Sequence, residues 1–230
     1  MNTLGIFVKH PVPGAVKTRL AAALGPKLSA EFYSAFVADL TARFRAVAGR
    51  RVLCYSPASA EAAEYFRRLA ECKYEIWPQP CGSLGDRLSA FFEEFLTTPD
   101  DRTVAIGSDS PTLPAETVGW AFEWLAERDC VIGPATDGGY YLVGLRGRNR
   151  PIFEGIDWST SRVLKQTIDR ISAASATLAL LPPWYDVDTV DDLSLLQGHV
   201  RALQWAGAAV SLENTLCVLH RDALQDDASL

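Results

Sequence analysis

Apolar and polar positions follow two different patterns along this chain, and the two patterns alternate. Short, nearly continuous apolar runs predict buried strands; they lie at 3–9, 50–56, 74–79, 103–108, 130–135, 138–145 and 177–183. Segments with apolar residues three and four positions apart predict helices; they lie at about 28–48, 59–71, 84–96, 113–128, 159–172 and from 189 onward. The first of these helices would place one set of side chains on a single face: Phe32, Phe36, Val37, Leu40 and Phe44.

Alternation of strand and helix with short links predicts an α/β fold, with a mostly parallel central sheet and helices on both faces. One hairpin-like insertion is expected near 134–145, where Asp137-Gly138-Gly139 is a turn signal. Ser159 or Thr160 is the expected cap of the helix at 159–172. We expect a single domain over residues 1–220 and a polar C-terminal tail over 221–230.

Composition narrows the class of protein without naming a ligand. The formal net charge of −6 argues against nucleic acid as a partner, because nucleic acids attract basic faces. Five cysteines without a C-x-x-C pair favour reduced thiols, and no apolar stretch is long enough to span a membrane. The expectation is a cytoplasmic protein that does not associate with membranes; the oligomeric state stays open.

The first strand is followed by a basic loop, VKHPVPGAVKTRL, at residues 8–20. No acidic residue precedes Glu31, and the basic residues of this region are Lys9, Lys17, Arg19 and Lys27. In open α/β sheets ligands bind where strands end, so this loop suits a polyphosphate, and Gly14 would allow a close backbone approach. The simpler alternative is a charged, solvated loop, and Lys27 fits that alternative best.

Two acidic motifs follow later strands. Asp109 in GSDSPTLP could hold a divalent cation beside phosphate oxygens, or it could cap the next helix. In DVDTVDD, Asp186 and Asp188 alternate along an extended segment and need a cation or a basic group to neutralise them. Thr189 and Asp192 match a capping box, which explains those two residues but not the pair before them.

Two further loops are candidates for substrate contacts. GSLGDRL at 82–88 could frame a nucleobase, or it could simply start a helix; its candidate residues are Gly82, Gly85, Asp86 and Arg87. TDGGYYL offers Asp137 as an acceptor-site carboxylate between Tyr140 and Tyr141, although a tight turn into a strand would use the same residues. Trp158 is expected in the core or against a helix.

Taken together, FVKHPVPGAVKTRL, GSLGDRL, GSDSPTLP, GPATDGGYYLVGL, GIDWST and DVDTVDDL resemble an uncharacterised bacterial glycosyltransferase ("transferase 1") family. That family belongs to the nucleotide-diphospho-sugar transferase superfamily, which has the GT-A fold. The resemblance covers residues 3 to about 205 and is more distant to 2-phospho-lactate guanylyltransferase and molybdenum-cofactor guanylyltransferase. Where sugar transferases carry a short D-x-D, residues 107–109 read G-S-D.

The resemblance implies a nucleoside-phosphate site over the first half of the sheet. Catalytic roles would fall to Lys17, Arg19 and Asp109, and Mg²⁺ (or Mn²⁺) would be held by Asp109 and Asp188. Nucleotide contacts would come from Lys9, Gly14, Lys17, Arg19, Gly82, Gly85, Asp86, Arg87 and Ser108, and acceptor contacts from Asp137, Gly138, Gly139 and Tyr140.

Two classes of function follow from these motifs. The first is a metal-dependent transferase that takes a nucleoside triphosphate or a nucleotide-sugar and a small-molecule acceptor, with nucleotidyl transfer slightly favoured over glycosyl transfer. The second is a non-catalytic nucleotide-binding regulatory module. A purely structural α/β domain would leave the polar loops at one sheet edge unexplained.

Overall fold

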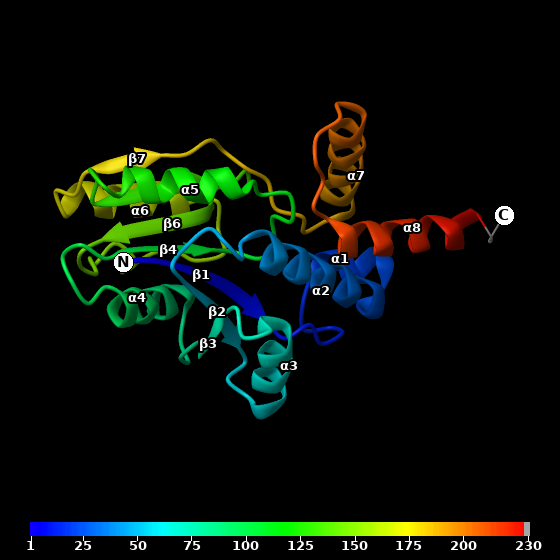
Figure 1. The fold of residues 1–230 in the computed structure, drawn as a ribbon, viewed down its shortest axis with the longest axis horizontal. Coiled ribbons are helices and arrows are strands. Elements are labelled where there is room, and N and C mark those ends of the chain that lie inside the picture. The colour runs from blue at the N-terminus through cyan, green and yellow to red at the C-terminus, as the bar shows by residue number, and fades with distance from the viewer. Residues whose placement is uncertain (228–230) are drawn as a thin grey trace.

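The computed structural model describes residues 1–227, and its centre is one seven-stranded sheet in the order β3-β2-β1-β4-β6-β5-β7 (Figure 1). The strands are β1 (Asn2–Lys9), β2 (Arg50–Ser56), β3 (Glu75–Pro78), β4 (Arg102–Ile106), β5 (Cys130–Pro134), β6 (Tyr140–Arg146) and β7 (Leu178–Leu180). Strand β6 runs antiparallel to β4 and β5, and the other neighbouring strands pair in parallel. The predicted mostly parallel sheet is confirmed, with β6 as the return strand of the expected hairpin-like insertion.

Helices cover both faces of this sheet. They are α1 (Thr18–Leu24), α2 (Pro26–Arg43), α3 (Ala60–Ala70), α4 (Leu84–Phe95), α5 (Ala115–Trp124), α6 (Val163–Ala173), α7 (Val190–Trp205) and α8 (Glu213–Asp227). Side chains of α2, α3 and α5 pack in one apolar cluster on one face, and those of α4 and α6 pack in a second cluster on the other. Both faces of a mostly parallel sheet must be covered because its strands are apolar on both sides.

Helix α2 joins the sheet to a helical extension that lies to one side of it (Figure 1). All five apolar residues predicted for one face of α2 are buried, but they serve two clusters. Val37, Leu40 and Phe44 pack on the sheet, whereas Phe32 and Phe36 pack with α1, α7 and α8. Helix α2 therefore contributes side chains both to the sheet and to the extension.

Several predicted boundaries differ from the structure. Helix α6 starts at Val163 after Arg162, with no side-chain cap, so the predicted cap at Ser159 or Thr160 is wrong. Ser159 instead has a left-handed backbone, which a helix N-cap does not take. Helix α1 was not predicted, because its alanine-rich sequence carries little apolar periodicity.

The division into a domain at 1–220 and a tail at 221–230 stays a prediction. The backbone of α8 continues to Asp227, and the last three residues of the predicted tail lie outside the described residues. Within residues 1–227, no helix is both long enough and apolar enough to cross a lipid bilayer.

Helix α8 is anchored to α2 through one buried carboxylate. Asp39 on α2 accepts hydrogen bonds from the backbone N–H and the side chain of both Asn214 and Thr215, at 2.6–3.0 Å. Asp39 thereby satisfies backbone donors in the first turn of α8, which have no partner within the helix.

We expect Asp39→Ala to lower the free energy of unfolding by about 3 kcal/mol, because it leaves buried donors of α8 unpaired. Urea denaturation followed by circular dichroism measures the change. Asp191→Ala is the matched control: Asp191 is an exposed carboxylate in the first turn of α7, and its loss should cost less than about 1 kcal/mol. Equal effects of the two substitutions would contradict the anchoring role.

Candidate functional site

A cleft of about 780 Å³ opens at the carboxyl ends of the strands. Its walls come from the loops after β1, β3, β4 and β5, the segment before α6 and the segment after β7. In a sheet of this type, that edge is where ligands bind. The loops that were expected to carry the site therefore surround a cleft.

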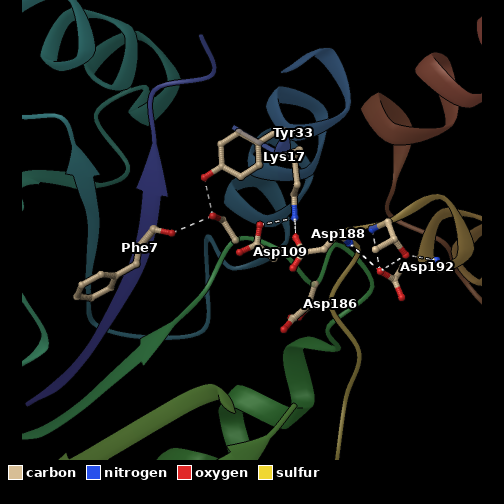
Figure 2. A network of polar contacts seen from close by, with 10 residues as sticks. Phe7, Lys17, Tyr33, Asp109, Asp186, Asp188 and Asp192 are labelled. Carbon is tan, nitrogen blue, oxygen red and sulfur yellow. Dashed lines mark hydrogen bonds and ion pairs between the residues drawn. The ribbon is translucent and has the colours of Figure 1, made fainter. Parts of the chain in front are cut away.

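Lys17 is the centre of the polar contacts in this cleft (Figure 2). Its Nζ donates to Asp188 Oδ1 at 2.8 Å and also forms an ion pair with Asp109 Oδ1. The Lys17 side chain is only 2% exposed, whereas the side chains of Asp109 and Asp188 are 44% and 39% exposed. The ammonium is thus enclosed, and the two carboxylates stand between it and the cleft.

The backbone of Lys17 is in the left-handed region, with φ 47° and ψ 47°, at the position before α1. For a residue with a Cβ this conformation costs about 1–2 kcal/mol. The buried side chains of Val16 and Leu20 hold the chain on either side. The strained turn aims the Lys17 side chain inward instead of along the solvated loop.

Two effects oppose each other on the Lys17 ammonium. Burial alone would lower its pKa, but the attraction and hydrogen bonds of Asp109 and Asp188 outweigh burial and raise the pKa above its ordinary value. The rings of Tyr33 and Phe36 lie 5.9 and 5.8 Å from Nζ and add favourable cation–π contacts. Lys17 therefore stays charged at any physiological pH.

A second network ties β1 to β4 beside Asp109 (Figure 2). Ser108 Oγ donates to the carbonyl of Phe7 at 2.9 Å and shares a 2.8 Å hydrogen bond with the hydroxyl of Tyr33. The same hydroxyl accepts from the backbone N–H of Lys9 at 2.8 Å. Ser108, predicted to contact the nucleotide, thus fixes the strand ends around Asp109.

The carboxyl of Asp186 has a raised pKa. Its carboxyl accepts from the hydroxyl of Ser110 and is half-buried at the floor of the cleft. Burial raises its pKa to about 7, and the nearby Asp109, Asp137 and Asp188 also raise it, against the lowering effect of the Ser110 hydrogen bond. Near neutral pH this carboxyl carries its proton in part of the molecules, which relieves repulsion among the carboxylates.

Helix capping explains only part of the two acidic motifs. Helix α5 has Pro114 at its N-cap and no side-chain cap, so neither Asp109 nor Ser110 caps it. Thr189 and Asp192 do form the predicted capping box of α7. Helix capping therefore accounts for Thr189 and Asp192. It does not account for Asp109, Asp186 and Asp188, which line the cleft.

The basic side chains of the cleft lie on its β1–β3 side. Lys9 and Arg19 are exposed there, and Arg87 reaches it from α4. Gln79 accepts from Arg87 Nη1 at 3.2 Å and donates its own amide to the Cys54 carbonyl at 2.5 Å. The end of β2 thereby sets the position of Arg87 through Gln79.

The structure brings most of the predicted site residues to the cleft wall: Lys9, Lys17, Arg19, Gly82, Arg87, Ser108, Asp109, Asp137, Gly139, Tyr140 and Asp188. Four predicted residues are not among the lining residues: Gly14, Gly85, Asp86 and Gly138. Asp86 is engaged with Ser83 in the capping box of α4. Gly85 and Gly138 allow close packing instead, because a Cβ there would lie 2.7 Å from Trp158 Nε1 and 2.5 Å from the Ser161 carbonyl oxygen.

Sequence reasoning missed Tyr33, Gln79 and the 159–161 segment as parts of the site. Tyr33 lies in the middle of an apolar helical face, and its sequence neighbours carry no sign of a contact with β1. Gln79 directly follows β3, so its position at a strand end was the available signal. Trp158, expected in the core or against a helix, packs against the second apolar cluster and close to Gly85 of α4, and it also lines the cleft.

The residues present fit a magnesium ion of the kind that nucleotide enzymes use. Within the described residues, no group of three or more acidic, histidine or cysteine side chains forms a complete metal cage. However, Mg²⁺ is usually held by one or two carboxylates, with waters and substrate phosphates as its other ligands. Asp109 and Asp188 offer such a pair, since they converge on one ammonium and remain partly exposed to the cleft.

Comparison with known proteins identifies the class. A model of the family described as "Uncharacterized protein conserved in bacteria (DUF2064)" matches residues 37–160. A solved structure from Desulfovibrio desulfuricans G20, provisionally described as a nucleotide-diphospho-sugar transferase, is 32% identical, with a TM-score of 0.87 over 97% of this chain and 96% of that one. The fold is that of the nucleotide-diphospho-sugar transferases, as the sequence resemblance implied. Within that fold class, the chain belongs to the DUF2064 family.

More distant structures share the fold alone. The inositol-1-phosphate CTP transferase from T. maritima has a TM-score of 0.53 at 14% identity, over 91% of this chain and 98% of that one. A nucleotidyl transferase from Methanothermobacter thermautotroptrophicus has a TM-score of 0.55 at 13% identity, over 88% of this chain and 99% of that one. No curated protein sequence matches this chain.

We expect Lys17→Met to make Mn²⁺ binding tighter and the metal-free protein less stable. Methionine keeps the apolar stem but removes the ammonium. Asp109 and Asp188 then repel each other, and a metal ion no longer competes with the ammonium for their carboxylates. In EDTA, urea denaturation should show a loss of about 2 kcal/mol, less than for a fully buried pair because both carboxylates are half-exposed. Addition of MnCl₂ should restore part of the loss.

Lys27→Met, at an exposed lysine of the same region, is the matched control and should change neither quantity. Titration with Mn²⁺ followed by electron paramagnetic resonance gives the affinity. A Lys17→Met protein with weaker Mn²⁺ binding than the native chain would contradict this description of the carboxylates.

We expect Asp186→Asn to change the pH dependence of stability. A carboxyl with a pKa of about 7 in the folded state and about 3.8 when unfolded favours folding below pH 4 and loses that contribution as pH rises to 7. The asparagine variant should therefore be more stable than the native chain at pH 8, on the order of 2 kcal/mol for a half-buried group, and the difference should vanish near pH 4. Urea denaturation in EDTA at pH 4.5, 6 and 8 measures it; a difference that does not vary with pH would refute the shifted pKa.

Proposed function

We propose that this chain is a divalent-metal-dependent transferase that uses a nucleoside triphosphate or a nucleotide-sugar and transfers part of it to a small acceptor. The observation that carries the proposal is the meeting of Asp109 and Asp188 at Lys17. One carboxylate follows β4 and the other follows β7, and both are partly exposed to the 780 Å³ cleft. Such a pair opposite a basic wall suits a metal–polyphosphate complex.

Each group of the site has a role in this proposal. Asp109 and Asp188 would hold the metal, which supplies positive charge that stabilises the phosphate oxygens. Lys17 holds the two carboxylates together in the metal-free protein. Arg19 and Lys9 bind the outer phosphates from the opposite wall, and Arg87, positioned by Gln79, lies where the base or ribose would rest.

Nucleotidyl transfer is the favoured reaction because a triphosphate best matches the charge of the basic wall. An acceptor oxygen forms a bond to the α-phosphorus while the bond from that phosphorus to the oxygen bridging to the β-phosphate breaks. Pyrophosphate leaves, and any proton on the acceptor oxygen passes to water. No covalent enzyme intermediate is required, since positioning and charge stabilisation account for most catalysis of this kind.

Glycosyl transfer is the second candidate. In that reaction the acceptor oxygen would form a bond to the anomeric carbon while the bond from that carbon to the diphosphate oxygen breaks. A nucleoside diphosphate would leave, and the proton of the acceptor hydroxyl would pass to water. The name of the Desulfovibrio protein, 32% identical over nearly the whole chain, supports keeping this candidate. The regulatory-module alternative would bind nucleotide without turnover.

The reaction product separates these candidates. With Mg²⁺ present and a panel of nucleoside triphosphates, nucleotide-sugars and acceptors, nucleotidyl transfer releases pyrophosphate and glycosyl transfer releases a nucleoside diphosphate. Asp109→Asn should lower turnover by about 100-fold or more while leaving the circular dichroism spectrum unchanged, because it removes charge at the metal. Asp191→Asn, at an exposed carboxylate of α7, should retain full activity. Metal-independent turnover that survives Asp109→Asn would overturn the proposed metal role.

A further inference from the structure

Apart from the enclosed ion pairs of Lys17 with Asp109 and Asp188, the charges that line the cleft lie on two different sides of it. Its basic lining residues come from the loop after β1 and from α4: Lys9, Lys17, Arg19 and Arg87. Its acidic lining residues come from the ends of β4 and β5 and from the segment after β7: Asp109, Asp137, Asp186 and Asp188. Within the described residues, no lysine, arginine or histidine lines the cleft on the β5–β7 side.

Two loops that pack on each other build this acidic side. The backbone N–H of Leu164 donates to the carbonyl of Gly138 at 2.9 Å. Gly138 has a φ of +91° and touches the backbone of Ser161 so closely that any side chain there would clash. The turn at 136–139 and the segment at 158–161, which we call the acceptor wall, therefore form one preorganised surface.

The acceptor wall presents hydroxyl, aromatic and carboxylate groups. Ser159, Thr160 and Ser161 are exposed and line the cleft next to Trp158. Trp158 and Tyr140 pack edge to face with their ring centroids 6.3 Å apart. Asp137 uses Oδ1 to accept from the N–H of Gly139 at 2.8 Å, so the turn orients its carboxylate.

The basic residue that directly follows the acceptor wall in the sequence is Arg162, and its side chain is paired with another residue. Its guanidinium forms a 2.9 Å ion pair with Asp157, and it does not line the cleft. A phosphate on the acceptor wall would thus face Asp137 without a cation to balance it, and like charges in such proximity are unfavourable.

We propose that the acceptor of this enzyme is a neutral, hydroxyl-rich molecule of the sugar or polyol class, held by the acceptor wall, and not a phosphorylated one. The hydroxyl groups of such a molecule would donate to Asp137 and exchange hydrogen bonds with Ser159 and Ser161, and its carbon skeleton would rest beside Trp158. This inference rests on the proposed function, because the acceptor wall has this meaning only if the basic wall takes the nucleotide.

Matched pairs of ligands test the proposal. The probes are myo-inositol with inositol 1-phosphate, methyl glucoside with glucose 1-phosphate, and glycerol with glycerol 3-phosphate. Saturation-transfer difference NMR measures their binding in Mg²⁺, first alone and then with whichever nucleoside triphosphate or nucleotide-sugar gives the largest thermal shift. At least one neutral member should bind ten times more tightly than its phosphorylated partner.

Two variants locate the binding. Asp137→Asn keeps a hydrogen-bond acceptor for the turn but removes the charge. The affinity for the neutral ligand should therefore fall about tenfold. Arg162→Ala should leave that binding unchanged. Tighter binding of the phosphorylated members, or their weakening by Arg162→Ala, would overturn the proposal, as would the failure of every neutral member to bind.

Failure of the proposed function has a different signature. If no nucleotide shifts the thermal transition in Mg²⁺, the transferase proposal fails, whereas a neutral ligand that is weakened by Asp137→Asn would still identify the acceptor wall. If a nucleotide binds and the phosphorylated members are preferred, the transferase proposal stands and the acceptor class is wrong.

Discussion

The enclosed ammonium of Lys17 is the interaction on which the arrangement of the site depends. It connects three distant parts of the chain, because the loop after β1 supplies the ammonium while the ends of β4 and β7 supply Asp109 and Asp188. A buried charge is tolerated only when it is paired. The left-handed turn at Lys17, the packing of α1 on α2 and the path of the chain after β7 all serve that pairing.

The same interaction explains why a chain of net charge −6 opens with an acid-free basic segment. Of the basic residues in that segment, one is turned inward to neutralise two carboxylates, and Lys9 and Arg19 remain at the cleft. A pair of aspartates with an internal counter-ion is stable without a metal, and its partly exposed carboxylates stay available to one. The protein thus keeps the proposed metal-binding pair in the folded chain without leaving two like charges unbalanced.

The helical extension of α1, α7 and α8 gives this arrangement its support. Phe32 and Phe36 of α2 pack against the extension, while the later turns of the same helix pack on the sheet. The segment that carries Asp186 and Asp188 leads directly into α7 through the capping box of Thr189 and Asp192. The positions of the carboxylates therefore depend on helices that lie outside the α/β layers proper.

Sequence by itself determined the class of fold and which loops meet at one edge of the sheet. Apolar periodicity is a local property, so the strand at 50–56 and the helix starting at Leu84 could be read directly. Because ligands gather at strand ends, the positions of four residues along the chain were enough to predict them as neighbours: Lys17, Arg19, Asp109 and Asp188. Local chemistry also determined the capping box at Thr189.

Only the tertiary structure decided what those residues do to one another. Lys17 was expected to face phosphates, and its enclosure between Asp109 and Asp188 depends on contacts more than 90 positions apart along the chain. The roles of Tyr33 and Gln79, and the close packing at Gly85 and Gly138, likewise depend on which segments meet in space. The separation of charge across the cleft also depends on the tertiary structure, because the sequence gives each charged residue but not the side of the cleft on which it lies.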